Sequence, residues 1–240
     1  MIRTEKTPLY EAPLWRDFNE GLRRPGGLEL TDYALSLCGI SAGARVLDVG
    51  CGGGFSVEYL SSRFGFITEG CDISDQMIEE ARLRFPAKIF FKADTAAIPC
   101  SGGCYDAVLA ECSLSICNDL SAALSEINRV LVAEGRLIIT DMYLRGRGGA
   151  GTADNGKSCL QKLSPEWKWR KALQAEGFEI LCIKERSSDL GSLIARIIFE
   201  FGSVENFYSE WLGGPDDCGV KDSTAKPGYF LAVCRKKGDL

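Results

Sequence analysis

Glycines and one acid gather at the end of an early apolar run, at residues 46–55. Asp48 stands two residues before the first of four glycines, Gly50, Gly52, Gly53 and Gly54. Glycine lets a backbone turn tightly and approach a ligand closely. The common phosphate motifs do not fit, because the last glycine of G-x-G-x-x-G would fall on Phe55 and no Gly-Lys-Ser/Thr is present in the loop. A carboxylate here would repel a pyrophosphate and attract an α-amino group or a sulfonium, so the loop predicts a ligand of the second kind.

Further acids end three of the apolar runs that follow, namely Asp72, Asp94 and Glu111. Asp141 and Tyr143 come at and just after the end of another run. Ligands of open parallel sheets bind outside the carboxyl ends of the strands. These side chains are therefore candidates for the same site as the glycines.

The sequence contains no histidine, which excludes Ser–His and Cys–His catalysis, His-ligated metals and an imidazole base. Its 11 cysteines are scattered, with no Cys-x-x-Cys pair. Several lie inside apolar runs, where cysteine behaves as a small buried hydrophobe. We therefore expect no metal site and no disulfide framework, with a reactive thiol or a Cys-only metal site as the alternatives.

Strand and helix patterns alternate along most of the chain. The apolar runs predict strands at 45–50, 66–72, 88–93, 105–111, 135–141, 178–184 and 229–234. Amphipathic spacing predicts helices at 55–64, 74–85, 120–131 and 164–177, and one or two helices at 189–212 with a break at Gly202. Ser74 and Ser164 are the expected N-caps of two of these helices. This alternation implies a parallel sheet with helices on both faces.

Size and charge narrow the class of protein. A chain of 240 residues with 45% hydrophobic and 25% charged residues suits one α/β domain. The net charge is −5 and the basic clusters, 23–24 and 235–237, are short, so a long nucleic acid is not expected as the partner. No apolar run approaches the ~18 residues of a membrane span, and the first residues lack an apolar signal core. We expect a cytoplasmic protein without a membrane span.

The glycine stretch resembles motif I of the class I S-adenosylmethionine (SAM)-dependent methyltransferases, with Asp-x-Gly-x-Gly at 48–52. The likeness continues in order through residues 70–77, 92–99, 105–109 and 126–135, and it covers about residues 41–141. It is closest to the branch that includes ubiquinone and menaquinone biosynthesis methyltransferases. The resemblance implies a Rossmann-like three-layer sandwich with a seven-stranded, mostly parallel sheet. The implied strand order is 3-2-1-4-5-7-6, with the last strand antiparallel.

The resemblance also implies SAM as cofactor and S-adenosylhomocysteine as product. Asp72 would accept the ribose hydroxyls, Asp94 the adenine amino group, and Glu111 would lie over the methionine arm. The open alternatives are a helix N-cap for Asp72, a surface turn acid for Asp94 and a solvated loop acid for Glu111. The implied cofactor-binding residues are Asp48, Gly50, Cys51, Gly52, Gly54, Asp72, Ile73, Met77, Asp94, Thr95 and Glu111.

The implied function is methyl transfer to a small-molecule acceptor by in-line displacement. A base is needed only for a protonated acceptor, and the candidates are Glu111, Asp141 and Tyr143. We expect an N-terminal helical lid, 1–40, and a methyltransferase domain, 41–240, with a helical insertion at about 189–212, and the acceptor pocket would come from segments outside the core. Within these parts the segments 10–27, 146–156 and 193–212 are the candidates. The alternatives are a SAM-binding protein without transferase activity, or a methyltransferase acting on RNA, protein or a metalloid.

Overall fold

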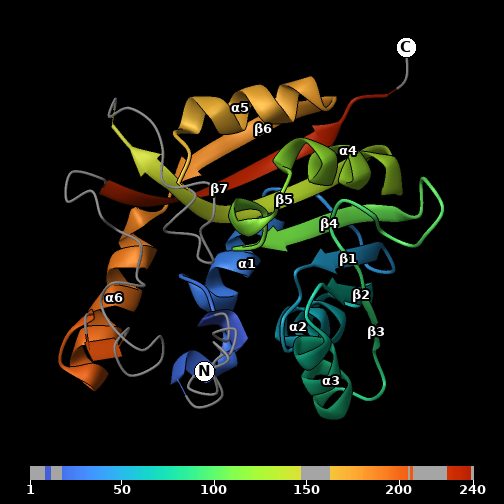
Figure 1. The fold of residues 1–240 in the computed structure, drawn as a ribbon. Coiled ribbons are helices and arrows are strands. Elements are labelled where there is room, and N and C mark those ends of the chain that lie inside the picture. The colour runs from blue at the N-terminus through green and yellow to red at the C-terminus, as the bar shows by residue number, and fades with distance from the viewer. Residues whose placement is uncertain (1–8, 12–17, 147–162, 205, 208–225, 239–240) are drawn as a thin grey trace, which may run out of the picture.

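A seven-stranded sheet with helices on both faces forms the body of the protein (Figure 1). The computed structural model describes residues 9–11, 18–146, 163–204, 206–207 and 226–238. The strands are β1 Arg45–Val49, β2 Ile67–Asp72, β3 Ile89–Lys92, β4 Tyr105–Glu111, β5 Leu131–Arg145, β6 Phe178–Glu185 and β7 Lys226–Lys236. The helices are α1 Gly27–Ser36, α2 Phe55–Phe64, α3 Asp75–Arg84, α4 Leu120–Val130, α5 Glu166–Ala175 and α6 Ser187–Phe201, with short 3-10 turns η1 Leu9–Glu11, η3 Phe18–Gly21 and η4 Leu114–Ile116.

The order of the strands is β3-β2-β1-β4-β5-β7-β6. The first five strands of this order pair in parallel, and β7 runs antiparallel to both β5 and β6. The predicted order and the antiparallel last strand are confirmed. The order reverses between β1 and β4, and ligands of open α/β sheets bind at such a switch point.

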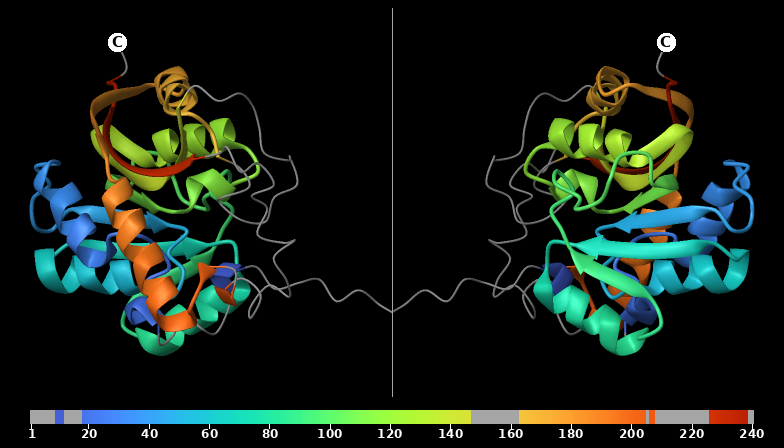
Figure 2. Two further views of the ribbon diagram at one scale, coloured as in Figure 1. Left: turned by 90° about the vertical axis from the view of Figure 1, so that its left-hand side faces the viewer. Right: turned by 90° about the vertical axis from the view of Figure 1, so that its right-hand side faces the viewer.

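Alternate residues of the strands supply two separate hydrophobic cores, one on each face of the sheet. Leu47 and Val49 of β1 point to the face covered by α4 and α5, where Trp169 is buried. Val46, which precedes Leu47 and alternates with it in the pleat, points to the face covered by α1 and α2, where Leu30 and Leu60 pack. The sandwich therefore has three layers, as the two side views show (Figure 2).

The N-terminal segment and α6 meet beside the second of these faces. Phe18 is buried, and its ring lies 5.7 Å from that of Phe201 and 6.3 Å from that of Phe207. Ile197 completes this small cluster. The two segments that the sequence assigns to a lid and an insertion therefore contact each other through aromatic rings.

The strand β5 is longer than predicted. The sequence suggests a turn at residues 134–135 before a strand that starts at 135, but the strand begins at Leu131 and runs to Arg145. Glu134 has a φ of +62°, and the pairing register with β4 shifts near Tyr105. Pairing with β7 as far as Lys226 extends the other end. Partners distant in the sequence lengthen this strand beyond its own apolar pattern.

The start of α5 also differs from the prediction by one residue. Pro165, in an extended conformation, occupies the N-cap position that the sequence gives to Ser164. The carbonyl of Ser164 instead accepts the backbone N–H of Leu144 at the end of β5. This tertiary pairing holds Ser164 outside the helix.

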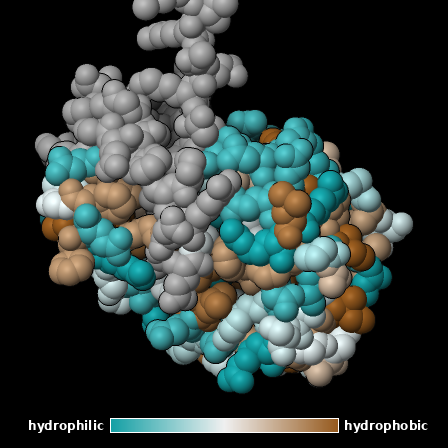
Figure 3. Space-filling model, turned by 90° about the horizontal axis from the view of Figure 1, so that it is seen from below, coloured by the Kyte–Doolittle hydropathy of each residue, from teal (hydrophilic) through white to brown (hydrophobic). Residues whose placement is uncertain are grey.

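The surface mixes polar residues with scattered apolar ones on the face seen in Figure 3. The largest exposures of apolar side chains in the described chain are those of Phe199 and Leu83, at 89% and 85%. Within that part of the chain, no helix is both long enough and apolar enough to cross a membrane.

Candidate functional site

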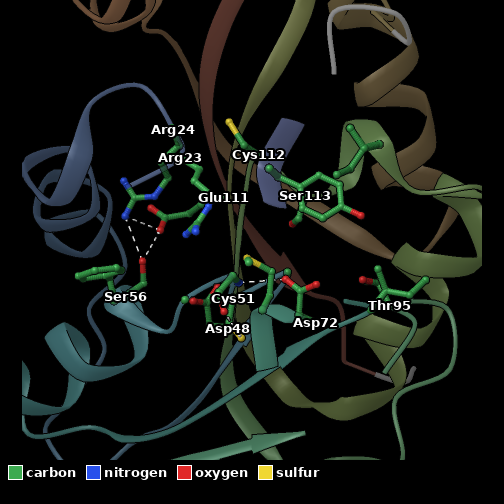
Figure 4. Close-up of a pocket in the computed structure, with 18 of the residues that line it drawn as sticks. Arg23, Arg24, Asp48, Cys51, Ser56, Asp72, Thr95, Glu111, Cys112 and Ser113 are labelled. Atoms are coloured by element: carbon green, nitrogen blue, oxygen red, sulfur yellow. Dashed lines mark hydrogen bonds and ion pairs between the residues drawn. The ribbon is translucent and has the colours of Figure 1, made fainter. Parts of the chain in front are cut away.

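A cavity of about 620 Å³ lies at the carboxyl ends of β1, β2 and β4 (Figure 4). The glycine loop after β1 forms one side of it, and the residues after β4 form another. The N-terminal segment closes over it with Tyr10, Glu11, Gly21, Leu22, Arg23 and Arg24. The volume lies within the range of sites that enclose one small organic ligand.

The glycine loop adopts backbone conformations that other residues avoid. Gly50, Gly52 and Gly54 have φ values of +73°, +51° and +79°. A Cβ on Gly50 would overlap the side chain of Ser113, and one on Gly54 would lie 2.6 Å from the ring of Phe90. Gly50 and Gly52 line the cavity, whereas Gly54 lies outside it and begins α2.

Asp72 ties the glycine loop to the end of β2. One carboxylate oxygen accepts the backbone N–H of Gly52 and the other that of Ser74, each at 2.9 Å. Ser74, as predicted, is the N-cap of α3 and accepts the N–H of Met77. Burial raises the pKa of Asp72 in spite of these bonds. Each oxygen keeps further lone-pair capacity and the residue lines the cavity, so Asp72 can also accept hydroxyl groups of a ligand.

Glu111 lies at the centre of a buried polar network that crosses the floor of the cavity. One oxygen accepts from Thr31 Oγ1 at 2.9 Å, and the other accepts from Ser56 Oγ at 2.9 Å and pairs with Arg24 Nη2 at 2.7 Å. Arg24 Nη2 also donates to both hydroxyl oxygens. The network, drawn in part in Figure 4, joins the N-terminal segment, α1, α2 and β4. Glu111 is thus not a solvated loop acid.

Asp48 carries a carboxyl group at the wall of the cavity, 3% exposed as a residue. Burial and the nearby charge of Glu111 raise its pKa well above the ordinary value, against the attraction of Arg24. One guanidinium therefore faces two carboxyl groups. A cationic group of a ligand would supply the charge that this side of the cavity lacks.

The remaining expected cofactor residues follow β2 and β3, apart from Cys51, which belongs to the loop after β1. Asp94 is exposed, and one of its oxygens accepts the N–H of Ala96, so it shapes a turn as well as lining the cavity. Four others also line it, namely Cys51, Ile73, Met77 and Thr95. The structure thus brings ten of the eleven expected residues to one cavity, all except Gly54.

Two of the three candidate bases lie outside the cavity. Asp141 is fully buried and accepts the N–H groups of Ser115 and Met142, and burial raises its pKa to about 6. Tyr143 packs edge-on against Phe230 in the core. Asp141 therefore positions the loop after β4 and cannot reach a ligand in this cavity.

Sequence reasoning missed Ser56 and Thr31 as partners of Glu111, and most of the wall after β4. Ser56 and Thr31 are ordinary helix residues in the sequence, and only the pairing across the fold reveals them. The wall comprises Cys112, Ser113, Ile116, Cys117 and Asn118. Cys112 has a φ of +53°, an unusual value that no sequence pattern signals.

The expected acceptor segments are placed only in part. Residues 147–162 and 208–225, which include Tyr208 and Trp211, lie outside the described residues. Phe199 points to solvent and Phe207 packs on Phe18, so neither lines the cavity. Among the described residues, no group of three or more cysteines and acids could hold a metal ion.

Comparisons with known proteins point to methyltransferases. A model of the methyltransferase domain family matches residues 47–139. An uncharacterized methyltransferase, YodH of Bacillus subtilis, is 30% identical over 65% of this chain and 68% of its own. A malonyl-[acyl-carrier protein] O-methyltransferase of Erwinia billingiae is 30% identical over 62% of this chain and 52% of its own.

A solved structure has the same fold. Phosphoethanolamine N-methyltransferase 2 of Haemonchus contortus, in complex with S-adenosyl-L-methionine, superposes with a TM-score of 0.74. The alignment has 19% identity and covers 95% of this chain and 56% of that one. The chain spans about half the length of several curated relatives that it matches.

Proposed function

The chain belongs to the family of SAM-dependent methyltransferases, and we propose that it transfers a methyl group to a small-molecule acceptor by in-line displacement. The cavity on the glycine loop carries this proposal, because it gathers ten of the residues that the family motifs assign to the cofactor. The motifs between residues 41 and 141 further support the ubiquinone and menaquinone biosynthesis branch.

The cavity fits the cofactor in shape and in charge. The glycines leave the floor open to close approach, and Asp72 offers acceptors for ribose hydroxyls. Asp48 supports a bound amino group or sulfonium, since it shares the guanidinium of Arg24 with Glu111. Asp94 and Thr95 are proposed to contact the adenine from the end of β3. When bound, SAM supplies a methyl group already activated by its sulfonium.

This chain contributes alignment and exclusion of water rather than a base. Glu111 uses its oxygens on Arg24, Ser56 and Thr31, so it holds the cavity floor instead of taking a proton. Holding two reactants in line is a large part of what such a transfer requires. We therefore propose an acceptor that needs no protein base or that loses its proton to solvent.

The N-terminal lid, together with Phe55 and the residues after β4, is proposed to form the acceptor side. Leu22 of the N-terminal segment, Phe55 and Ile116 give the cavity an apolar part, which favours a small, partly apolar acceptor. Of the similar proteins, one is an O-methyltransferase and another an N-methyltransferase, which supports transfer to oxygen or nitrogen.

A panel of small acceptors tests the proposal. The protein is incubated with SAM and with phenols, carboxylic acids, thiols or amines, and S-adenosylhomocysteine and the methylated product are measured by mass spectrometry. We expect stoichiometric product and S-adenosylhomocysteine with at least one class and none without acceptor. Binding of the cofactor without turnover by any class would instead support the alternative of a SAM-binding protein that transfers nothing.

A further inference from the structure

Two half-buried cysteines lie close together in the loop that joins β3 and β4. Cys100 and Cys104 carry free thiols, and each packs against the hydrophobic core. They have the tightest cysteine spacing in the sequence, with three residues between them. The described lining of the cavity contains neither of them. The site described above therefore leaves this pair of thiols unused.

The end of α4 anchors the backbone of both cysteines. Arg129 Nη1 donates to the carbonyl of Cys100 at 2.8 Å. The N–H of Cys104 donates to the carbonyl of Val130 at 2.8 Å. Between the cysteines, Gly103 has a φ of +65°, a conformation that glycine adopts readily, and its N–H donates to the carbonyl of Arg129 at 3.0 Å. The fold thus holds both ends of a short turn against two neighbouring residues of the helix end.

The two thiols are within hydrogen-bonding reach of each other. Burial raises the pKa of the Cys100 thiol, and the Cys104 thiol raises it further, against the attraction of Arg129. The thiol of Cys104 also donates to the carbonyl of Ser101 at 2.9 Å, inside the same turn. Since a disulfide requires two side chains that approach closely and point toward each other, this pair meets the first condition for one.

A bound metal ion would explain the pair less well. Structural zinc sites use four ligands, and in the described chain no group of three or more cysteines and acids could hold a metal ion. Two adjacent thiols suffice, in contrast, for thiol–disulfide exchange, in which one thiol is oxidised and the other releases the product.

We propose that Cys100 and Cys104 are a modification site, at which a small disulfide oxidises the pair to an intramolecular disulfide. The thiolate of one cysteine attacks a sulfur of the small disulfide and releases one small thiol. The second cysteine then attacks the mixed disulfide and releases the other small thiol. The two cysteines lose two electrons and two protons, and the small disulfide takes up both to become two thiols. The proposal does not depend on the proposed function.

The cross-link would lie beside the cavity without entering it. Asp94 and Thr95, in the first half of the same loop, line the cavity, whereas the two cysteines lie in its second half. Arg129 also holds the carbonyl of Ile98, between these halves, at 3.0 Å. Oxidation of the pair would therefore add a reversible restraint to a loop that forms part of the cavity wall.

Glutathione disulfide is the probe that tests the proposal. Reduced protein is incubated with it at pH 8, free thiols are blocked with iodoacetamide, and the chain is cleaved after Lys92 and Tyr105. This cleavage separates the pair from Cys112 and Cys117, so mass spectrometry can assign the linkage. We expect more than about half of the wild-type molecules to contain the internal disulfide without bound glutathione, since the second thiol displaces it.

Matched variants and unfolded protein are the controls. Cys100→Ser and Cys104→Ser each leave one thiol of the pair, which should keep glutathione as a stable adduct. Cys182→Ser removes another half-buried thiol, on β6, and should leave oxidation of the pair unchanged. In wild type unfolded with urea, the pair should keep glutathione or join other cysteines. Melting curves confirm that each variant is folded.

Three outcomes overturn the proposal. The first is a folded wild type in which Cys100 or Cys104 stays free, keeps glutathione or pairs with another cysteine of the chain. The second is an internal disulfide that forms as readily in urea as in the folded protein, since the fold would then contribute nothing. The third is loss of this disulfide in folded Cys182→Ser. The measurements on wild type decide the matter even where a variant does not fold.

Discussion

The side chain of Glu111 acquires its role from partners remote in the sequence. Sequence reasoning gave it a position at the end of a strand but left its side chain open between ligand contact and solvent. Thr31 lies 80 positions away and Ser56 lies 55 positions away, so no local pattern reveals them. Arg24 lies in the segment 10–27, which the sequence assigns to the acceptor pocket and not to a pair with Glu111.

Breaking the Arg24–Glu111 pair should destabilise the protein strongly. Glu111→Leu removes the carboxylate that pairs with the buried Arg24 at 2.7 Å, and breaking a buried pair from one side costs roughly 3–5 kcal/mol. The double variant Arg24→Met/Glu111→Leu removes both charges and should be more stable than Glu111→Leu alone. Urea unfolding measures both. A double variant less stable than the single one would show that the two charges do not act as a pair.

Asp141 should leave a signature in the pH dependence of stability. Its pKa in the folded protein is about 6, above the ordinary value of a carboxyl group. Between about pH 4 and pH 6 the folded state holds a proton that the unfolded state releases, so Asp141 lowers stability as pH rises through this window. The contribution is roughly 2–3 kcal/mol.

The comparison of wild type with Asp141→Asn isolates this group. Asp48 and Asp72 also have raised pKa values and act in the same direction in both proteins. The unfolding free energy of wild type should therefore decrease more, or increase less, between pH 4 and pH 7 than that of the variant. Urea titrations at the two pH values measure this difference. Equal changes in the two proteins would contradict the raised pKa.

At the scale of elements, the boundaries of helices and strands that the sequence predicted correctly depend on local signals. The boundaries that it predicted wrongly depend on tertiary contacts. The helix α2 begins and ends at the predicted residues because glycines flank an amphipathic run on both sides. The cap of α3 at Ser74 follows from its hydroxyl. β5 and the start of α5 were misjudged because β7 and Leu144 decide them through pairing. The sequence could predict ten residues that line one cavity because the motif fixes most of them at or after strand ends, whereas Ser56 and most of the wall after β4 required the fold.

The start of α2 depends on a glycine. Gly54→Ala forces an alanine into a left-handed conformation and brings its Cβ to 2.6 Å from the ring of Phe90. The left-handed backbone conformation of alanine costs roughly 1–2 kcal/mol of stability, and the overlap with Phe90 costs roughly 1–3 kcal/mol. Urea unfolding should therefore show a loss of about 2–5 kcal/mol.

Gly43 provides the matched control. Its φ is +82°, but nothing lies within 4 Å of the position of its Cβ. Gly43→Ala should therefore lose only the stability that the left-handed backbone conformation costs, and nothing from steric overlap. Equal losses in the two variants would mean that Phe90 moves aside without cost.

At the scale of the whole molecule, the site is built where separate parts of the chain meet. The sheet supplies the glycine loop and the acids, and the N-terminal segment covers them with Arg23 and Arg24. The same segment is fastened to α6 through Phe18. Closure of the cavity thus depends on contacts between the N-terminal segment and α6.

Metal removal should leave the protein unchanged. The described residues contain no cluster of three cysteines or acids that could hold a metal, and most of the described cysteines pack as hydrophobes. We expect EDTA to shift the melting temperature by less than about 1 °C, since a structural metal contributes folding energy outright. A fall of several degrees together with released zinc, measured with a chromogenic chelator, would contradict this.

The most direct test of the account is the affinity for S-adenosylhomocysteine in wild type and in Asp72→Ala, measured by titration calorimetry. We predict micromolar binding to wild type, and a loss of about 1–3 kcal/mol in the variant, because Asp72 both accepts ligand hydroxyls and holds the N–H of Gly52. Binding of equal strength in the two proteins, or no binding to wild type, would contradict the claim that this cavity is the cofactor site.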